Sequence, residues 1–153
     1  MLKKTFLTIT VFLIANLLLV SCVFASSEMW SQTYGGPEYD VASSLVETSD
    51  GGFLLAGYTD DEFGFYSDVL LVKTDAQGNT NWEQVYSRDD QDFAYSVVAT
   101  PDGGFAVAGS SGSALDGRSA HFWLIKLDSD GNVVWNQTYV EGTARSLVVT
   151  SDG

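Results

Sequence analysis

The chain has 153 residues with a formal net charge of −13, 15 glycines, 18% charged residues and 13% aromatic residues. This length can form one modest domain with its own core. Few charges beside many glycines and aromatics exclude long amphipathic helices and favour short strands joined by tight turns. The acidic balance repels nucleic acid and anionic lipid headgroups, so we expect no nucleic-acid partner.

The first residues have the pattern of an export signal. Lys3 and Lys4 precede an uncharged, largely apolar stretch that continues to residue 27. Basic residues stay on the cytoplasmic side, so the rest of the chain is exported. We therefore expect a signal peptide over residues 1–25 and Sec-dependent export to the cell surface or the extracellular space. Without the two lysines, five basic residues oppose 20 acidic ones, a net charge of about −15.

Three ways of processing this signal are open. Val23-Phe24-Ala25 is a small-x-small site whose cleavage releases a chain that begins at Ser26. The preceding Leu-Val-Ser-Cys resembles the lipobox of bacterial lipoproteins, in which Cys22 would be lipidated and become the mature N-terminus. The apolar stretch is also long enough to remain as an anchor. The chain would thus meet a membrane only through an anchor or a lipid. Cys22 is the only cysteine, which excludes an intramolecular disulfide.

An internal repeat of about 52 residues organises the chain after the signal. Trp30, Trp82 and Trp135 are 52 and 53 residues apart, and each opens a Trp-x-Gln-x-Tyr motif. Further matches at the same spacing join Ala42 to Ala94 and Ala144, Asp50-Gly-Gly-Phe53 to Asp102-Gly-Gly-Phe105, and Lys73 to Lys126. We divide the chain into repeat 1 (30–81), repeat 2 (82–134) and a truncated repeat 3 (135–153).

Each repeat is expected to form four short strands, which in repeat 1 lie at 30–34, 42–48, 53–59 and 68–74. The Asp-Gly-Gly sequences between the second and third strands supply the positive φ angles of a tight hairpin. The apolar runs 69–72 and 122–125 do not alternate with polar residues, so both faces of that strand should be covered. Such coverage follows when four-stranded sheets stack on one another. Gly57 and Gly109, inside strands, should permit a close backbone approach at the narrow inner end of each sheet.

We therefore predict an all-β fold of β-propeller type, made of four-stranded antiparallel blades, with a stacked β-solenoid as the alternative. Propellers close with 4–8 blades, whereas repeat 3 stops within its turn motif at Gly153. The prediction is an incomplete propeller, with two blades and the start of a third, from a longer protein. The open ends should be covered by the parent's remaining blades or by self-association, and Trp82 and Trp135 should be buried at blade contacts.

The repeat resembles the SBBP-type β-propeller repeat of bacterial and archaeal surface and secreted proteins. Repeat 1 supplies the matching positions Tyr34, Gly35, Gly36, Asp40, Ala42, Asp50, Gly51, Gly57, Thr59, Asp68, Lys73, Gly78 and Asn79. Repeat 2 departs from the pattern at Ser87-Arg88, Ser111 and His121. The resemblance implies a scaffolding or binding module and carries no catalytic residue.

A second similarity concerns the segments that lead into the tryptophans. Asp75-x-x-Gly78-x-x-x-Trp82 and its counterpart ending at Trp135 look like the tryptophan-docking motif of quinoprotein (PQQ) propellers. That resemblance implies a tryptophan packed between blades. A cysteine pair for stacking a quinone cannot form here, so the cofactor is not carried over.

Few residues suggest chemistry. His121 is the only histidine, and its place before an apolar strand favours a structural role over that of a general base. Asp128, Asp130 and Asn132 resemble the start of a calcium loop, although the distal Glu is missing and we favour a solvated hairpin turn. No catalytic residue, cofactor or further metal ligand is predicted. We expect a binding or structural scaffold with a protein or glycan ligand. The alternative is part of a propeller enzyme or quinoprotein relative whose catalytic residues lie outside this sequence.

Overall fold

The computed structural model describes residues 30–113 and 119–150. The predicted signal peptide, its Cys22 and residues 151–153 lie outside the described residues. The described residues contain strands and turns and no helix, and therefore no helix that could cross a membrane. The strands are β1 (Asp40–Glu47), β2 (Phe53–Asp60), β3 (Ser67–Thr74), β4 (Thr80–Tyr86), β5 (Gln91–Ala99), β6 (Phe105–Gly112), β7 (His121–Leu127) and β8 (Val133–Glu141).

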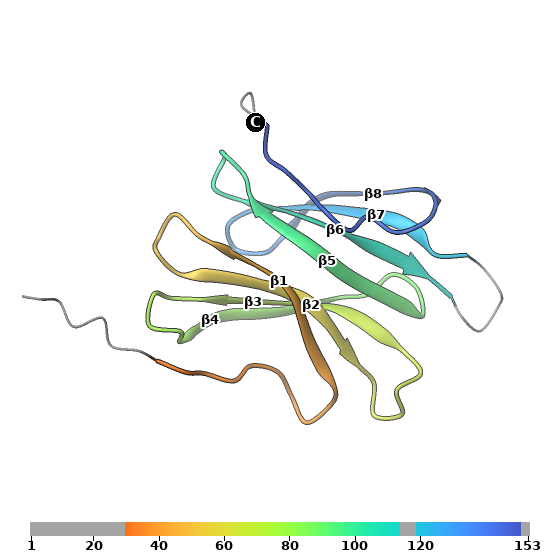
Figure 1. Ribbon diagram of the computed structural model, residues 1–153, viewed down its shortest axis with the longest axis horizontal. Helices are drawn as coiled ribbons and strands as arrows, with labels where there is room; N and C mark the ends of the chain where they lie inside the picture. The colour runs from red at the N-terminus through yellow and green to blue at the C-terminus, as the bar shows by residue number, and fades with distance from the viewer. Residues whose placement is uncertain (1–29, 114–118, 151–153) are drawn as a thin grey trace, which may run out of the picture.

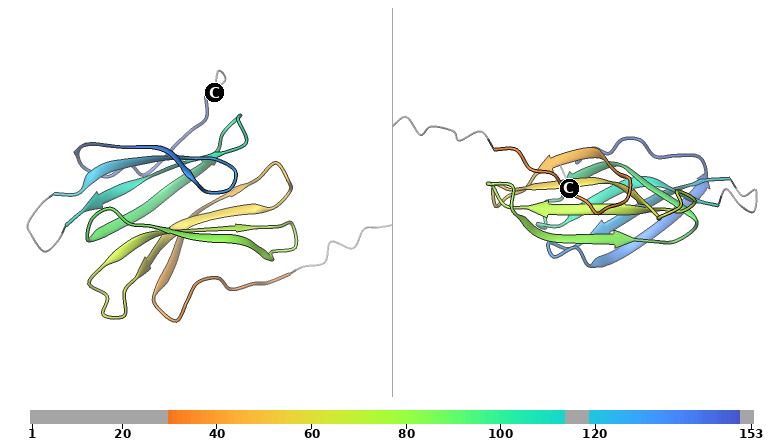
Figure 2. Two further views of the ribbon diagram at one scale, coloured as in Figure 1. Left: turned by 180° about the vertical axis from the view of Figure 1, so that it is seen from behind. Right: turned by 90° about the horizontal axis from the view of Figure 1, so that it is seen from below.

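The strands form two antiparallel meanders (Figure 1, and from behind and below in Figure 2). In the first meander, β1 to β4 pair in chain order, and β5 to β8 do the same in the second. One parallel pair, Ser67 with Gln91, joins them into an eight-stranded sheet that does not close on itself. The prediction of an all-β fold is confirmed.

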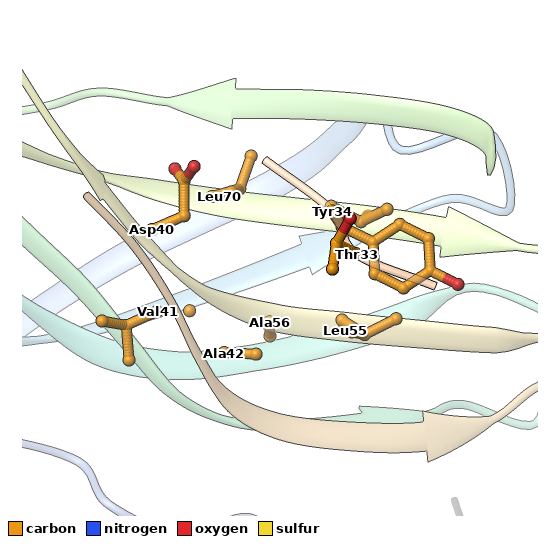
Figure 3. Close-up of a pocket in the computed structure, with 10 residues that line it drawn as sticks. Thr33, Tyr34, Asp40, Val41, Ala42, Leu55, Ala56 and Leu70 are labelled. Atoms are coloured by element: carbon orange, nitrogen blue, oxygen red, sulfur yellow. The ribbon is translucent and has the colours of Figure 1, made fainter. Parts of the chain in front are cut away.

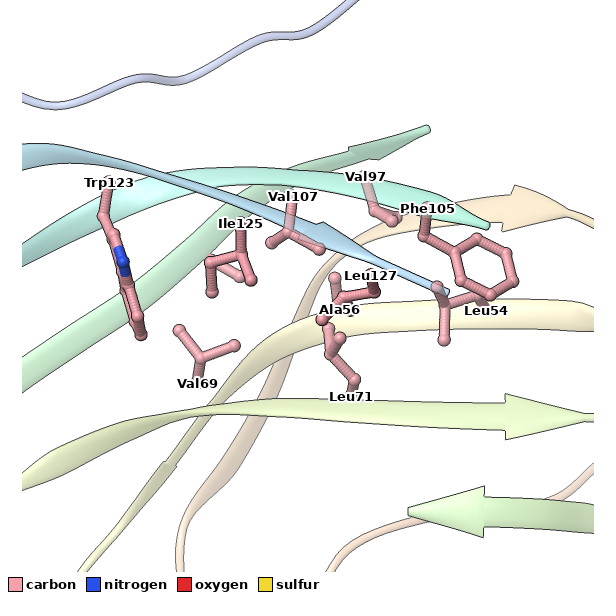
Figure 4. Packing of buried hydrophobic residues seen from close by; sticks show 11 residues of the cluster. Leu54, Ala56, Val69, Leu71, Val97, Phe105, Val107, Trp123, Ile125 and Leu127 are labelled. Carbon is pink, nitrogen blue, oxygen red and sulfur yellow. The ribbon is translucent and has the colours of Figure 1, made fainter. Parts of the chain in front are cut away.

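The hydrophobic core lies between the two meanders, as Figure 4 shows. Alternation along each strand sends every second side chain to one face of its sheet. The first meander contributes Leu54, Ala56, Val69 and Leu71, and the second contributes Ala94, Val97, Phe105, Val107, Trp123, Ile125 and Leu127. A buried side chain of this size stabilises the fold by roughly 1.5–3 kcal/mol, so this interface holds the meanders together.

The strand β3 is buried on both of its faces, as its apolar run predicts. Val69 and Leu71 face the second meander, whereas Leu70 and Val72 lie on the opposite face and are 8% and 2% exposed. In β7 the equivalent run is covered less evenly, because Trp123 is buried and Leu124 only half-buried. We call the face of each meander that carries Leu70 or Trp123 its front face, and the opposite one its back face.

The meanders are out of phase with the sequence repeats by one strand. Trp82 lies in β4, which pairs with β3 through Lys73, so the Trp-x-Gln-x-Tyr strand closes a meander and does not open one. The hairpin between β3 and β4 causes this difference in phase. It is tight, since the Asp75 N–H donates to the Asn79 carbonyl at 2.9 Å. Residues 30–34, predicted as a strand, form none in the described chain.

The expectation that Trp82 and Trp135 are both buried is wrong for Trp135. Trp82 is half-buried against the core, with its ring centroid 6.5 Å from that of Phe105 in the second meander. Trp135 occupies the same position in β8 and is 49% exposed. The difference has a simple cause, since the second meander packs on β4 but no third meander packs on β8 within the described residues.

This asymmetry predicts different costs for the same substitution. Trp82→Ala should lower the free energy of unfolding by about 2 kcal/mol, since a half-buried indole loses its contacts with Phe105. Trp135→Ala should cost less than about 1 kcal/mol, because this ring is largely in water. Urea unfolding of the two variants measures both values, and equal losses would contradict the burial difference.

Gly57 and Gly109 do permit a close backbone approach, as predicted. A Cβ atom on Gly57 would lie 1.7 Å from the Val41 carbonyl oxygen, and one on Gly109 would lie 1.8 Å from that of Phe93. Each glycine thus faces the first strand of its own meander, next to a register shift in that strand. Only hydrogen fits at these two positions.

Gly109→Ala should therefore lower the free energy of unfolding by at least about 2 kcal/mol, because the backbone of β5 must move aside. Gly36→Ala is the matched control, since a Cβ there has no heavy atom within 4 Å. The control should change stability by less than about 0.5 kcal/mol. Thermal and urea unfolding of both variants gives the comparison.

Candidate functional site

At one end of the strands the connections are alike in the two meanders, and at the other end they differ. One end, which we call the constant end, carries the turns at 48–52, 75–79, 100–104 and 128–132. The opposite or variable end carries residues 35–39, 61–66 and 87–90, together with Ser113 and residues 119–120. The turns of the constant end have the same contacts in both meanders, whereas the connections of the variable end differ in length and sequence. Connections that vary on a repeated scaffold are the usual carriers of binding function.

At the constant end, an aspartate holds each Asp-Gly-Gly turn. Lys73 Nζ lies 2.8 Å from Asp50 Oδ2, and Lys126 Nζ lies 2.9 Å from Asp102 Oδ2. The same carboxylates accept backbone N–H groups from Gly52 and Gly104 at 3.1 Å. The hydrogen bond from the lysine, followed by the others, holds the pKa of Asp50 and of Asp102 well below the usual range.

The low pKa values give these turns a pH dependence. A carboxyl whose pKa is lower in the folded than in the unfolded chain adds stability above the unfolded pKa of about 4. That stability is lost as the pH falls through the folded pKa. We expect the thermal midpoint of the wild type to fall more steeply between pH 4 and 2 than that of the Asp50→Asn, Asp102→Asn double variant.

The measurement is a series of calorimetric or circular-dichroism melts across this pH range. Asp130→Asn is the control, because Asp130 binds the Asp128 carboxylate through its backbone N–H, which this substitution keeps. Identical slopes for the wild type and the double variant would mean that the lysine pairs do not stabilise the turns.

The predicted calcium residues lie in the turn at 128–132. Asp128 Oδ1 accepts the backbone N–H groups of Asp130 at 3.0 Å and Asn132 at 2.8 Å, and Asn132 Nδ2 donates to Asp128 Oδ2 at 2.9 Å. The hydrogen bonds, led by that of the Asn132 side chain, lower the pKa of Asp128. Asp75 and Asn79 form the same arrangement in the first meander. This is hairpin-turn geometry, and no group of three metal-binding side chains occurs among the described residues.

At the variable end, the β2–β3 loop displays large aromatic side chains. Asp61 Oδ1 accepts the backbone N–H groups of Phe65 at 2.7 Å and Tyr66 at 3.0 Å, which fixes the loop. Phe63, Phe65 and Tyr66 are 72%, 62% and 43% exposed. Tyr39, which is 66% exposed, lies at the start of the same loop, because its carbonyl accepts the N–H of Asp60. We call Tyr39, Phe63, Phe65 and Tyr66 the aromatic tip. Exposed rings on a hydrogen-bonded loop form a ready contact surface.

A polar pocket of about 250 Å³ lies at the same end of the second meander. Its lining residues are Arg88, Asp89, Ser111, Gly112, Ser113, Ser119, His121 and Thr138. The Ser111 hydroxyl donates to Asp89 Oδ2 at 2.9 Å, and Arg88 Nε lies 3.6 Å from the same oxygen. The pocket therefore offers hydroxyl, guanidinium, carboxylate and imidazole groups, which suit a ligand with several polar groups.

The sequence placed His121 at a strand edge but not in this pocket. The other lining residues come from the β4–β5 connection, from β6, from Ser113 and Ser119, and from β8. The pairing of Ser111 with His121 across β6 and β7 places two of them side by side. The one signal in the sequence was the departure of repeat 2 from repeat 1 at Arg88, Ser111 and His121. All three of these departures line the pocket.

Asp92 is a fully buried carboxyl at the base of the variable end. Its Oδ2 accepts the backbone N–H groups of Arg88 and Asp89, and burial raises its pKa. Asp40 takes the same role in the first meander, where its Oδ2 accepts the Gly36 N–H at 2.8 Å. The Oδ1 atoms of both aspartates have no hydrogen-bond partner among the described residues. These aspartates shape the connection into β1 and β5.

An apolar hollow of about 280 Å³ lies on the front face of the first meander (Figure 3). Its lining residues are Thr33, Tyr34, Asp40, Val41, Ala42, Leu55, Ala56, Gly57, Leu70 and Val72. The hollow lies across the first meander from the core and has a different chemistry from the polar pocket.

Comparison with known protein families finds no family model that matches the chain, and comparison with curated proteins finds no relative. The resemblance to SBBP-type and quinoprotein repeats therefore stays a prediction from the sequence.

Proposed function

We propose that this chain is an exported β-propeller-type repeat module that acts as a binding scaffold for a protein or glycan ligand at its variable end. The contrast between the two ends carries this proposal. The turns of the constant end preserve their aspartate contacts from one meander to the next, whereas the variable end carries an aromatic tip in one and a polar pocket in the other. A scaffold that repeats its fold and varies its loops has the organisation of a binding module.

The propeller-type arrangement is supported by contacts between sheets that recur along the chain. Ser44 Oγ accepts the Val97 N–H at 3.2 Å, and Ser96 Oγ accepts the Leu147 N–H at 3.1 Å. A step repeated with the same contacts builds a regular stack of sheets. Four-stranded meanders with a period of about 52 residues favour a propeller over a solenoid.

The chemistry of the variable end favours a neutral or cationic ligand. Aromatic rings pack against the apolar faces of sugars or side chains, and hydroxyl groups bind polar substituents. The surrounding charge is strongly negative, which disfavours anions. The Ser111 hydroxyl donates to Asp89, and this contact holds the pocket wall.

Binding is tested with glycan and surface-protein arrays, followed by titration of the best ligand. The Phe63→Ser, Phe65→Ser double variant or Arg88→Gln should weaken binding at least about tenfold, since exposed aromatic and arginine anchors dominate such surfaces. Val133→Ser is the control, because Val133 is 46% exposed at the constant end. A ligand whose affinity is unchanged in both test variants would overturn the placement of the site.

Export is tested separately in a bacterial host with a Sec pathway. The product should appear outside the cytoplasm with a shortened N-terminus, because Lys3, Lys4 and the apolar stretch form a signal. Mass spectrometry then distinguishes a chain that begins at Ser26 from one that begins at lipidated Cys22. Full-length protein retained in the cytoplasm would contradict export.

A further inference from the structure

We propose that residues 30–34 are the outer strand of a further sheet, and that the front face of the first meander binds the inner hairpin of that sheet. The occupant is an antiparallel β-hairpin with the apolar pattern of β2 and β3. This inference rests on the proposed propeller-type stacking and adds a specific docking surface to it. It assigns a role to the apolar hollow and to a segment that forms no strand within the described chain.

The contacts of residues 30–34 reproduce those of β4. The Tyr34 hydroxyl donates to the Gly78 carbonyl at 2.8 Å, as the Tyr86 hydroxyl donates to the Gly131 carbonyl at 2.7 Å. The Trp30 ring lies 6.1 Å from Phe53, as Trp82 lies 6.5 Å from Phe105. The segment therefore lies on the first meander as β4 lies on the second.

Among the described residues, no strands lie beside residues 30–34 as β2 and β3 lie beside β4. On the front face of the second meander, Leu54, Ala56, Val69 and Leu71 of β2 and β3 cover Val107, Trp123 and Ile125. The equivalent positions on the first meander are Leu55, Leu70 and Val72, and they line the hollow of about 280 Å³. Figure 3 shows Leu55, Leu70 and Tyr34 around this space. The hollow thus lies where the side chains of two inner strands would fit.

The back face of the second meander is the counterpart of this surface. The Leu147 N–H binds Ser96 as Val97 binds Ser44, so residues near 147 take the place of a first strand there. Trp135 and Tyr139 on this side are 49% and 48% exposed, whereas Trp82 and Tyr86 are half-buried. On one side, residues 30–34 therefore take the place of the last strand of a sheet, and on the opposite side, residues near 147 take the place of a first strand. The two inner strands of such a sheet occur beside neither segment in the described chain.

The lining of the hollow defines the occupant. Apart from Asp40, its side chains are uncharged, and most are aliphatic or small. A hairpin that presents leucine, valine and alanine on one face would bury these groups, and its outer edge would pair with residues 30–34 as β3 pairs with β4. A charged peptide would leave its charges unpaired against this face.

The test supplies the hairpin covalently. Residues 52–81, which carry β2, β3 and the 75–79 turn, are placed directly before Trp30 in a chain that then continues to Gly153. The residues directly before Trp30 are then the same as those directly before Trp82. Backbone amides of residues 30–34 should gain at least about tenfold protection from hydrogen exchange, because strand pairing closes them to water. The thermal midpoint should also rise.

The matched control carries Leu54→Asp and Leu71→Asp in the added hairpin only. It should leave residues 30–34 unprotected, because the two carboxylates cannot enter the apolar hollow. Equal protection in both proteins would overturn the docking face, as would absence of protection in the first protein or loss of its native β-sheet spectrum. Ligand binding at the variable end is measured on the chain without the graft, so failure here leaves the proposed binding role standing.

Discussion

The structure depends on one packing arrangement, in which the back face of the first meander covers the front face of the second. Neither meander could keep its shape alone, because a lone four-stranded sheet leaves apolar side chains in water. The contact buries Leu54 and Leu71 of one sheet against Ile125 and Leu127 of the other. The Ser44 hydroxyl, which accepts the Val97 N–H, adds a directional contact that fixes how the sheets are aligned.

This arrangement separates the contacts that stabilise the sheets from the connections that differ between the meanders. The constant end is determined by short-range hydrogen bonds, in which Asp50, Asp75, Asp102 and Asp128 each accept backbone N–H groups of their own turn. Such turns form largely from local sequence. Lys73 and Lys126, from β3 and β7, add an ion pair to the two Asp-Gly-Gly turns. The variable end is then free to differ between meanders. An aromatic tip and a polar pocket can therefore share one scaffold without changing its core.

Much of this fold could be predicted from the sequence, because its signals are local or periodic. The Asp-Gly-Gly turns, the apolar runs and the strand glycines each specify a conformation within a few residues. Which strand begins each meander could not be predicted. The segment that begins at Trp82 follows a turn, and its alternating pattern suits the first strand of a sheet as well as the last. The exposure of Trp135 was also missed, since burial depends on what packs against a strand and not on its own sequence.

The candidate site was less accessible to sequence reasoning. The pocket around His121 brings together Arg88 of the β4–β5 connection, Ser111 of β6 and Thr138 of β8, and strand order and register are long-range properties. The aromatic tip is visible in the sequence as Phe63, Phe65 and Tyr66. Their exposure is not, and the loop that carries them is held by the Asp61 carboxylate, which accepts the backbone N–H groups of Phe65 and Tyr66.

The two faces of each meander also give the stack a direction. The front face of the second meander presents Phe105, Trp123 and Ile125, and the back face of the first meander presents Leu54, Ala56 and Leu71 to it. The contact joins unlike faces, so it is heterologous and differs from the isologous contact of a two-fold dimer. Repetition of a heterologous contact leads to a ring if the rotation closes and to an open array if it does not. The net charge of −13 opposes random association through the open faces. Only a sheet with the complementary face and edge gains enough contact to overcome that repulsion.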